Sequence, residues 1–263
     1  MPRGVRTSPL GTQEVPGSPY RVRVLQVGYS IPQADGTCRA DGSITLVWGG
    51  LVTALVDTGG PWDRQRLPQL LSEQGLSPGD ITHVVCTHGH SDHAGNINLF
   101  PAATLLLGWD LSRADGLYLR HGLAAGQPVQ LHPGLVEVVP TPGHTRSHVS
   151  LVVRGTAAGT VVVAGDVFER ERDEGQWRAL SEDPAEQERS RRRVLAMADV
   201  IVPGHGPPFR VLRDTGFLLV PEDGEGATSG DGSKQHENAP RGDGTFRSGP
   251  KEDEDGAGGG SML

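Results

Sequence analysis

Short runs of apolar, mostly β-branched residues recur between residues 20 and 206, and segments rich in glycine, proline and aspartate separate them. Runs of this length with such side chains are typical of β-strands. The pattern predicts strands within nine segments, which are residues 20–28, 43–48, 51–60, 81–90, 103–108, 135–144, 148–155, 160–168 and 200–206.

Helices are predicted in two of the intervening segments. One covers residues 67–74. The other covers residues 184–198, because Asp183 is a good N-cap, Pro184 suits the first helical position and Glu186 can complete a capping box. Strands that are interspersed with helices predict an α/β fold.

Composition divides the chain into three parts. Residues 1–19 are rich in proline and glycine and show no periodicity, so we expect a flexible arm. Residues 221–263 contain eleven glycines and almost no large apolar side chains, too few to offset the entropy lost on ordering. We therefore expect a single folded domain over residues 20–213 and a disordered tail, rich in glycine and acids, over residues 214–263.

Charge is unevenly distributed along the chain. The formal charge is −8, and residues 221–263 contribute −6 with ten acids and four bases, so the first 220 residues carry only −2. This balance argues against a broad basic field that would hold a polyanion. Lysine is absent before Lys234, so the domain's strong cations are arginines. On the second predicted helix we expect a solvated, charge-balanced face. Four of the arginines fall on this helix, which are Arg189, Arg191, Arg192 and Arg193.

The remaining composition indicates the compartment. Cys38 and Cys86 form no CxxC motif, so a disulfide framework is not expected. The first 20 residues lack the apolar run of a secretory signal, and no stretch approaches the ~20 apolar residues of a membrane span. We expect a protein of the cytoplasm and nucleus that does not bind membranes.

A stretch of unusual chemistry, THGHSDH, follows the fourth predicted strand. In an extended loop, residues two apart point the same way, so His88 and His90 can share one metal ion. Asp92 and His93 follow one step out of phase and can face a second ion. The five histidines that stand outside such motifs are expected to be structural: His83, His121, His132, His148 and His236.

Three further ligand-type residues stand directly after predicted strands, in TPGHT, AGD and VPGHG. They complete two shells if His144 joins His88 and His90 on one ion, His205 joins Asp92 and His93 on the other, and Asp166 lies between them. Nitrogen and oxygen ligands suit zinc, manganese or iron, and two such ions can hold and deprotonate a bridging water. We expect two Zn²⁺ ions, with Mn²⁺ or Fe²⁺ as alternatives, and catalytic roles for Asp92 and Asp166.

These motifs, preceded by LVDTGG, resemble the signature of the metallo-β-lactamase superfamily over residues 20–210. The resemblance implies a four-layer αββα sandwich with its site along one edge. It also implies that Asp57 orients the histidine loop and does not bind metal. The ligands alone do not name the substrate.

The stretches DTGGPW, GDVFER and VPGHGPPFRV resemble a branch of the superfamily linked to RNA cleavage at the 3′ end of histone pre-mRNA and described as dimeric. This resemblance favours an endoribonuclease with an RNA substrate and a possible homodimer. A thioester or lactone hydrolase similar to glyoxalase II and a non-catalytic scaffold remain as alternatives. Substrate-binding roles are predicted for Arg146, Arg120 and Tyr118.

Overall fold

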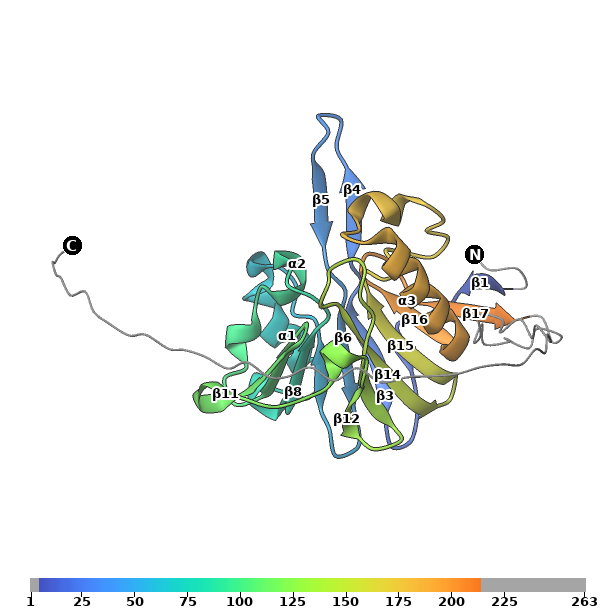
Figure 1. The fold of residues 1–263 in the computed structure, drawn as a ribbon. Coiled ribbons are helices and arrows are strands. Elements are labelled where there is room, and N and C mark those ends of the chain that lie inside the picture. The colour runs from blue at the N-terminus through green and yellow to red at the C-terminus, as the bar shows by residue number, and fades with distance from the viewer. Residues whose placement is uncertain (1–4, 214–263) are drawn as a thin grey trace, which may run out of the picture. The chain divides into compact units, whose positions relative to one another are not determined.

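Two mixed β-sheets packed face to face form the centre of the fold in the computed structural model, which describes residues 5–213 (Figure 1). One sheet contains, in spatial order, β1 (Val5–Pro9), β17 (Phe209–Arg213), β16 (Val200–Pro203), β15 (Gly159–Gly165), β14 (Val149–Thr156), β13 (Val136–Pro140) and β12 (Val129–His132). The other contains β11 (Leu117–Tyr118), β10 (Asp110–Arg113), β9 (Thr104–Leu107), β8 (His83–Cys86), β7 (Ala54–Val56), β6 (Ile44–Trp48), β3 (Arg21–Gln26) and β2 (Glu14–Val15). The expected tail over residues 214–263 lies outside the described residues.

Helices and a separate hairpin complete the fold. The hairpin consists of β4 (Tyr29–Pro32) and β5 (Cys38–Asp41), and the α-helices are α1 (Arg66–Ser72), α2 (Ser91–Ala94) and α3 (Pro184–Met197). Short 3₁₀ turns are η1 (Pro61–Asp63), η2 (Pro78–Asp80), η3 (Ile97–Leu99), η4 (Ala114–Gly116), η5 (Leu123–Ala125) and η6 (Gln176–Leu180). Among the described residues, every helix is too short or too polar to cross a lipid bilayer.

The alternation of side chains along each strand builds four layers. Val85 of β8 and Val163 of β15 lie in the apolar cluster between the two sheets. Val84, which precedes Val85 in β8, points to the outer face of the eight-stranded sheet, where it packs in a cluster with Leu71 of α1. On the opposite outer face, α3 covers the seven-stranded sheet in the same way. This arrangement confirms the predicted α/β class and the αββα order.

The predicted elements are observed in the structure. All nine strand segments contain strands, and both predicted helices form, as α1 and α3. The Asp183 carboxylate accepts hydrogen bonds from the backbone N–H groups of Ala185 and Glu186 at 3.1 and 2.9 Å, as an N-cap should. The expected capping box is wrong, because the Glu186 carboxylate accepts from Arg189 Nε at 3.0 Å and does not reach back to Asp183.

The N-terminal segment differs from the flexible arm expected over residues 1–19. Residues Val5–Pro9 form β1, which pairs antiparallel with β17 so that Val5 lies opposite Arg213. Residues Glu14–Val15 form β2 and pair with β3. The domain therefore begins by residue 5. Its first strand was missed because the pairing partner stands at the far end of the domain sequence.

The β4–β5 hairpin projects from the body of the domain (Figure 1) and was not predicted. Its strands carry no apolar run, and Tyr29 and Ile31 are exposed. The base of the hairpin is anchored, since Asp41 is buried and accepts hydrogen bonds from Trp62 Nε1 at 3.0 Å and from Gln26 Nε2 at 3.1 Å. This anchoring places the hairpin beside the functional site described next.

Candidate metal centre

The seven predicted ligands come from segments that follow strands of both sheets. β8 leads into His88 and His90, and α2 then carries Asp92 and His93. Strands of the other sheet lead into the remaining three, which are His144, Asp166 and His205. Parallel pairing of β7, β8 and β9, and of β15 and β16, brings the carboxyl ends of these strands together within each sheet.

His88, His90 and His144 form a tight group of imidazoles. His88 Nε2 lies 2.8 Å from His90 Nδ1, and His144 Nε2 lies 3.2 Å from the same nitrogen. His88 and His144 are buried, whereas His90 is exposed. Three converging nitrogens with an opening to solvent match the three-ligand shell of a catalytic zinc site.

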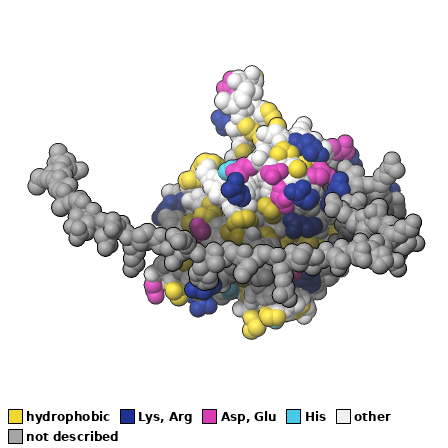
Figure 2. Space-filling model, viewed as in Figure 1, with side chains coloured by type: hydrophobic (Ala, Val, Ile, Leu, Met, Phe, Trp, Pro, Cys, Tyr) yellow, Lys and Arg dark blue, Asp and Glu magenta, His cyan; other side chains and the backbone are white. Residues whose placement is uncertain are grey.

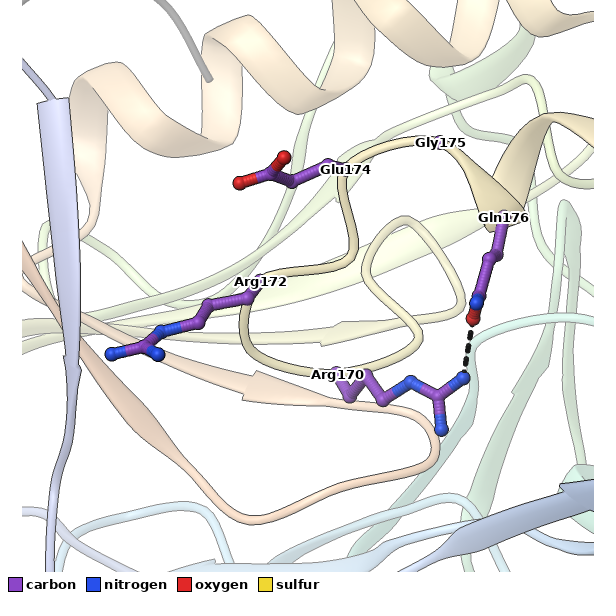
Figure 3. Close-up of a pocket in the computed structure, with 5 residues that line it drawn as sticks. All are labelled: Arg170, Arg172, Glu174, Gly175 and Gln176. Carbon is purple, nitrogen blue, oxygen red and sulfur yellow. Dashed lines mark hydrogen bonds between the residues drawn. The ribbon is translucent and has the colours of Figure 1, made fainter.

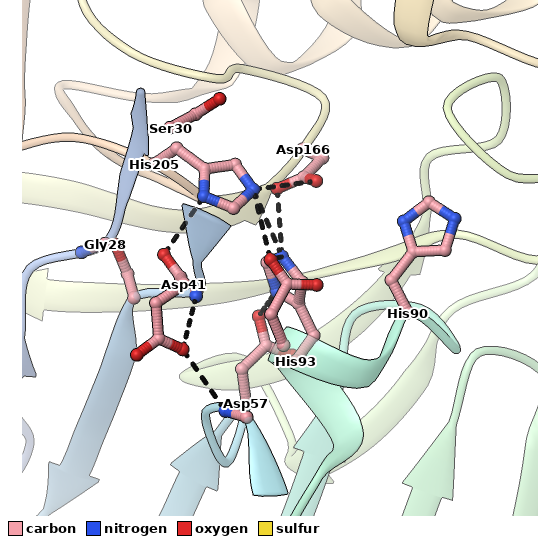
Figure 4. Close-up of polar contacts among 12 residues, drawn as sticks. Gly28, Ser30, Asp41, Asp57, His90, His93, Asp166 and His205 are labelled. Carbon is pink, nitrogen blue, oxygen red and sulfur yellow. Dashed lines mark hydrogen bonds and ion pairs between the residues drawn. The ribbon is translucent and has the colours of Figure 1, made fainter. Parts of the chain in front are cut away.

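Asp92, His93 and His205 form a second group. The Nε2 atoms of His93 and His205 lie 3.4 Å apart, and Asp92 Oδ2 lies 3.8 Å from each of them. Figure 4 shows His93 and His205 converging on Asp166, with His90 on the other side of the site. One carboxylate and two imidazoles at these distances can share a second divalent cation.

The Asp166 carboxylate lies between the two groups. Its Oδ2 atom lies 3.3 Å from His144 Nε2, 3.6 Å from His88 Nε2 and 3.2 Å from His205 Nε2. Its Oδ1 atom lies 3.3 Å from His93 Nε2. The carboxylate therefore faces donors of both groups and can bridge two cations, while Gly204 leaves the space that it needs, because a Cβ there would lie 1.8 Å from Oδ1.

The protonation of the imidazoles differs between the two donor groups. Burial lowers the pKa of His88 well below its usual value and that of His144 to about 4, so both imidazoles are neutral at pH 7. Burial favours a protonated Asp166, yet His93 and His205 hold its pKa well below the usual range. Burial also opposes charge on His205, but Asp166 raises its pKa to about 9, so that protons and metal ions compete for this nitrogen.

Asp57 lies behind the histidine loop and contacts it at three points. Its Oδ1 accepts from the Thr87 backbone N–H at 2.7 Å, and its Oδ2 accepts from the Thr87 hydroxyl at 3.0 Å and from His93 Nδ1 at 2.8 Å. Donation of Nδ1–H to Asp57 turns the Nε2 atom of His93 toward the cluster (Figure 4). Burial opposes charge on this imidazole, but Asp166 and Asp57 raise its pKa well above the usual value, so a metal ion must displace a proton from Nε2.

Replacement of Asp57 by asparagine should lower the affinity of the second ligand group for metal by about 10- to 100-fold, as loss of such supporting carboxylates does. Asparagine keeps the shape of Asp57 but carries no charge to orient His93. The measurement is competition with a chromophoric chelator, and D80N, at an exposed aspartate that caps η2, is the matched control. Equal affinities in D57N and the wild type would show that Asp57 does not support the ligand.

The backbone of the hairpin base orients His205. His205 Nδ1–H donates to the carbonyl oxygens of Tyr29 and Asp41, at 3.1 and 3.0 Å. This contact fixes the tautomer in which Nε2 faces Asp166 (Figure 4). The hairpin base is therefore hydrogen-bonded to the loop that carries His205, although the two segments stand 164 or more positions apart in the sequence.

Comparison with known proteins identifies the family. A model of the metallo-beta-lactamase superfamily matches residues 39–105. Over 209 residues the chain is 56% identical to Metallo-beta-lactamase domain-containing protein 1 of Xenopus laevis, covering 79% of this chain and 89% of that protein. The Homo sapiens protein of the same name is 53% identical over 264 residues, covering 89% and 96%. The chain belongs to the metallo-beta-lactamase superfamily.

A solved structure shares the fold of this superfamily member. It is an N-acyl homoserine lactone hydrolase with the product N-hexanoyl-L-homoserine bound at its catalytic metal centre. It aligns with a TM-score of 0.54 and 18% identity, covering 73% of this chain and 93% of that one. Superfamily membership and the paired donor groups make the chain a metal-dependent hydrolase.

The predicted substrate residues lie at different places in the metallo-beta-lactamase fold. Arg146 is exposed two residues after His144, and its backbone N–H donates to Glu182 Oε2 at 2.8 Å. Tyr118 and Arg120 lie on and after β11, which β9 and β10 separate from β8 and its histidine loop. Arg146 therefore lies near a predicted ligand along the chain, and within residues 5–213 no hydrogen bond or ion pair joins Tyr118 or Arg120 to the donor groups.

Two residues close to the cluster were not singled out as parts of the site. His148 is fully buried, and its ring stacks on His88 with centroids 5.2 Å apart, while Thr141 Oγ1 lies 3.0 Å from its Nδ1. Glu169 is buried three residues after Asp166, and burial raises its pKa to about 8. The spacing of His148 from His144 was a weak signal in the sequence, whereas no local pattern pointed to Glu169.

Proposed function

We propose that this chain is an endoribonuclease that cleaves RNA phosphodiester bonds with two divalent ions, most naturally Zn²⁺. His88, His90 and His144 hold one ion, and the second donor group holds the other. The observation that carries the proposal is the bridging position of Asp166 between two complete donor groups. Histone pre-mRNA is the substrate class that the DTGGPW and VPGHGPPFRV stretches imply by resemblance.

The chemistry divides between the ions and the side chains. Two bound ions supply Lewis acidity and lower the pKa of a bound water. The Asp92 carboxylate faces the Nε2 atoms of His93 and His205, and its side chain keeps 16% of its surface exposed. It is therefore the accessible carboxylate of the cluster and can orient the attacking water and accept its proton.

Arginines stand next to two of the ligand-bearing loops. Arg146 follows His144, and Arg170 packs against the loop of His205, since a Cβ on Gly206 would lie 2.8 Å from Arg170 Cβ. Arg170 lines an open depression and donates to Gln176 Oε1 at 2.5 Å (Figure 3). No ion pair within residues 5–213 involves either guanidinium, so both can contact phosphate.

Charge elsewhere on this face is mixed. Figure 2 shows basic and acidic side chains intermingled below the projecting hairpin. On α3, Arg189 and Arg192 pair with Glu186 and Glu188, which matches the solvated helix face expected there. Binding of RNA would therefore rest on a few local phosphate contacts rather than on a broad basic surface.

A direct comparison of substrates tests the proposal. Metal-reconstituted protein is assayed against single-stranded RNA, an N-acyl lactone and an acyl thioester, with D166A as the inactive control. We expect RNA cleavage above the level of D166A. Efficient lactone or thioester turnover, with RNA cleavage no greater than that of D166A, would replace the nuclease by a small-molecule hydrolase.

Replacement of Arg146 by alanine should raise the KM for RNA and leave both ions bound. Each lost contact to a single-stranded phosphate should reduce the slope of log affinity against log salt by about 0.7. Turnover of a neutral lactone should not change. The matched control is R192A, since Arg192 is exposed on α3 and pairs with Glu188. An unchanged salt slope in R146A would exclude Arg146 from phosphate binding.

The near-neutral charge of the domain favours a second candidate, a lactone or thioester hydrolase. The first 220 residues carry a formal charge of only −2, which suits an uncharged substrate better than a polyanion. The same donor groups would serve this reaction, because the developing charge again falls on oxygen. Activity that is insensitive to salt and to R146A would support this candidate.

A further inference from the structure

Glu169 is a buried carboxylate beside the second donor group. It is 5% exposed, and its Oε2 atom lies 4.0 Å from His205 Nε2. Its Oε1 atom is buried and has no hydrogen-bond partner among residues 5–213. A buried carboxylate without a partner is costly, so this group requires a cation or a proton.

Among residues 5–213, no arginine forms an ion pair with Glu169. The nearby Arg191 is committed to Asp173 and to the backbone, with Nη2 donating to the Asp173 carbonyl at 2.7 Å. The adjacent Arg170 is exposed and donates to Gln176. The one ion pair of Glu169 within residues 5–213 is with His205. A proton or a bound cation is therefore the further partner that this carboxylate requires.

The spacing around Glu169 suits a shared ion. Asp166, Glu169 and His205 each offer one donor atom, and these atoms lie within 4.8 Å of one another. His205 Nε2 lies 3.2 Å from the Asp166 carboxylate and 4.0 Å from that of Glu169. Both distances fall below the roughly 4.2 Å that separates opposite ligands with metal bonds of about 2.1 Å.

The backbone around Glu169 is held in place. Its carbonyl accepts the His205 N–H at 2.8 Å, and its own N–H donates to Asp173 Oδ2 at 3.3 Å. Arg191 anchors the same segment through Asp173 and the Val167 carbonyl. The backbone that carries the carboxylate is therefore held by contacts that do not depend on solvent, as it is in a preorganised site.

We propose that Glu169 is a further ligand of the ion bound by Asp92, His93 and His205. This inference rests on the metal centre of the proposed function. With Asp166 bridging, that position has three carboxylates and two imidazoles, whereas the other position has three imidazoles and one carboxylate. Carboxylate-rich sites of higher coordination number favour Mn²⁺ or Fe²⁺, and imidazole-rich tetrahedral sites favour Zn²⁺. Glu169 thus makes the two positions differ in metal preference.

The test measures metal binding without an activity assay. Metal-free protein receives one equivalent of Zn²⁺ and is then titrated with Mn²⁺, followed by calorimetry and by the electron paramagnetic resonance of bound Mn²⁺. E169Q should weaken the second ion by about 10- to 100-fold, in the range found when groups around a metal are lost. E174Q, at an exposed glutamate of the same segment, should bind like the wild type.

The outcomes separate this inference from the proposed function. Metal-free E169Q should unfold at the temperature of the metal-free wild type, and E169A should weaken Mn²⁺ at least as much as E169Q. If the wild type takes up two ions, and E169Q and E169A both bind Mn²⁺ as tightly as the wild type does, Glu169 is not a ligand. The dinuclear metal centre would still be supported by that result. If the wild type takes up no second ion, both the inference and the dinuclear centre are overturned.

Discussion

Replacement of Asp166 by alanine should abolish hydrolysis and release at least one of the two ions. The two carboxylate oxygens face His144 at 3.3 Å and His93 at 3.3 Å, so the side chain serves both donor groups at once. Its loss leaves the Nε2 atoms of His93 and His205 close together with no bridging anion. We expect activity to fall by more than about 100-fold, the upper end of the effect of losing a group that only supports a ligand.

Elemental analysis after chelator-free purification measures the metal content, and the substrate comparison above measures activity. D80A is the control, because Asp80 is exposed in η2, which precedes β8, whereas the opposite end of β8 leads into His88. If D166A retained both ions and the wild-type rate, the dinuclear reading of the site would be wrong. A scaffold protein with an unused metal site would show the same low activity in the wild type and in D166A.

Replacement of Arg191 by alanine should destabilise the domain more than any other arginine substitution on α3. Arg191 is 7% exposed, with its guanidinium carbon 4.1 Å from the Phe168 ring centroid and 4.7 Å from that of Trp177. Its Nη1 donates to the Val167 carbonyl at 2.6 Å, and it pairs with the fully buried side chain of Asp173. Removing one partner of such a pair costs about 3–5 kcal/mol.

For a domain of this size, that cost lowers the melting temperature by about 6–20 °C, at roughly 2–4 °C per kcal/mol. R192A is the matched control, since its exposed i,i+4 pair with Glu188 contributes about 0.3–0.5 kcal/mol. The double variant R191L with D173N should recover much of the loss, because it leaves no buried charge unpaired. A melting temperature of R191A equal to that of R192A would contradict the buried-pair argument.

The two arginine positions show where sequence reasoning was limited. The run ERSRRRVL predicted a solvated, charge-balanced face, and Arg189 and Arg192 pair with Glu186 and Glu188 in that way. Arg191 instead turns inward, between two aromatic rings. Helical periodicity places a residue on a face of the helix, but it does not reveal that a segment such as 168–177 will cover that face.

The sequence by itself determined the features that local spacing encodes. Apolar, mostly β-branched runs predicted nine strands, which are β3, β6 to β9 and β13 to β16, because such runs mark segments that bury side chains in a sheet. The pattern of THGHSDH, with His144, Asp166 and His205 after later strands, predicted a donor set that the structure brings together. The strand ends of two stacked sheets meet at one edge, so the position of ligand-type residues directly after strands is enough to predict that they lie close together.

Tertiary structure alone decided the features that depend on distant partners. The hairpin base orients His205 across 164 and 176 sequence positions, and β1 pairs with β17 across the whole domain. Glu169 reaches His205 only because β15 and β16 lie side by side. Such contacts leave no periodic trace in the sequence, because each arises when two segments with unremarkable local patterns pack against each other.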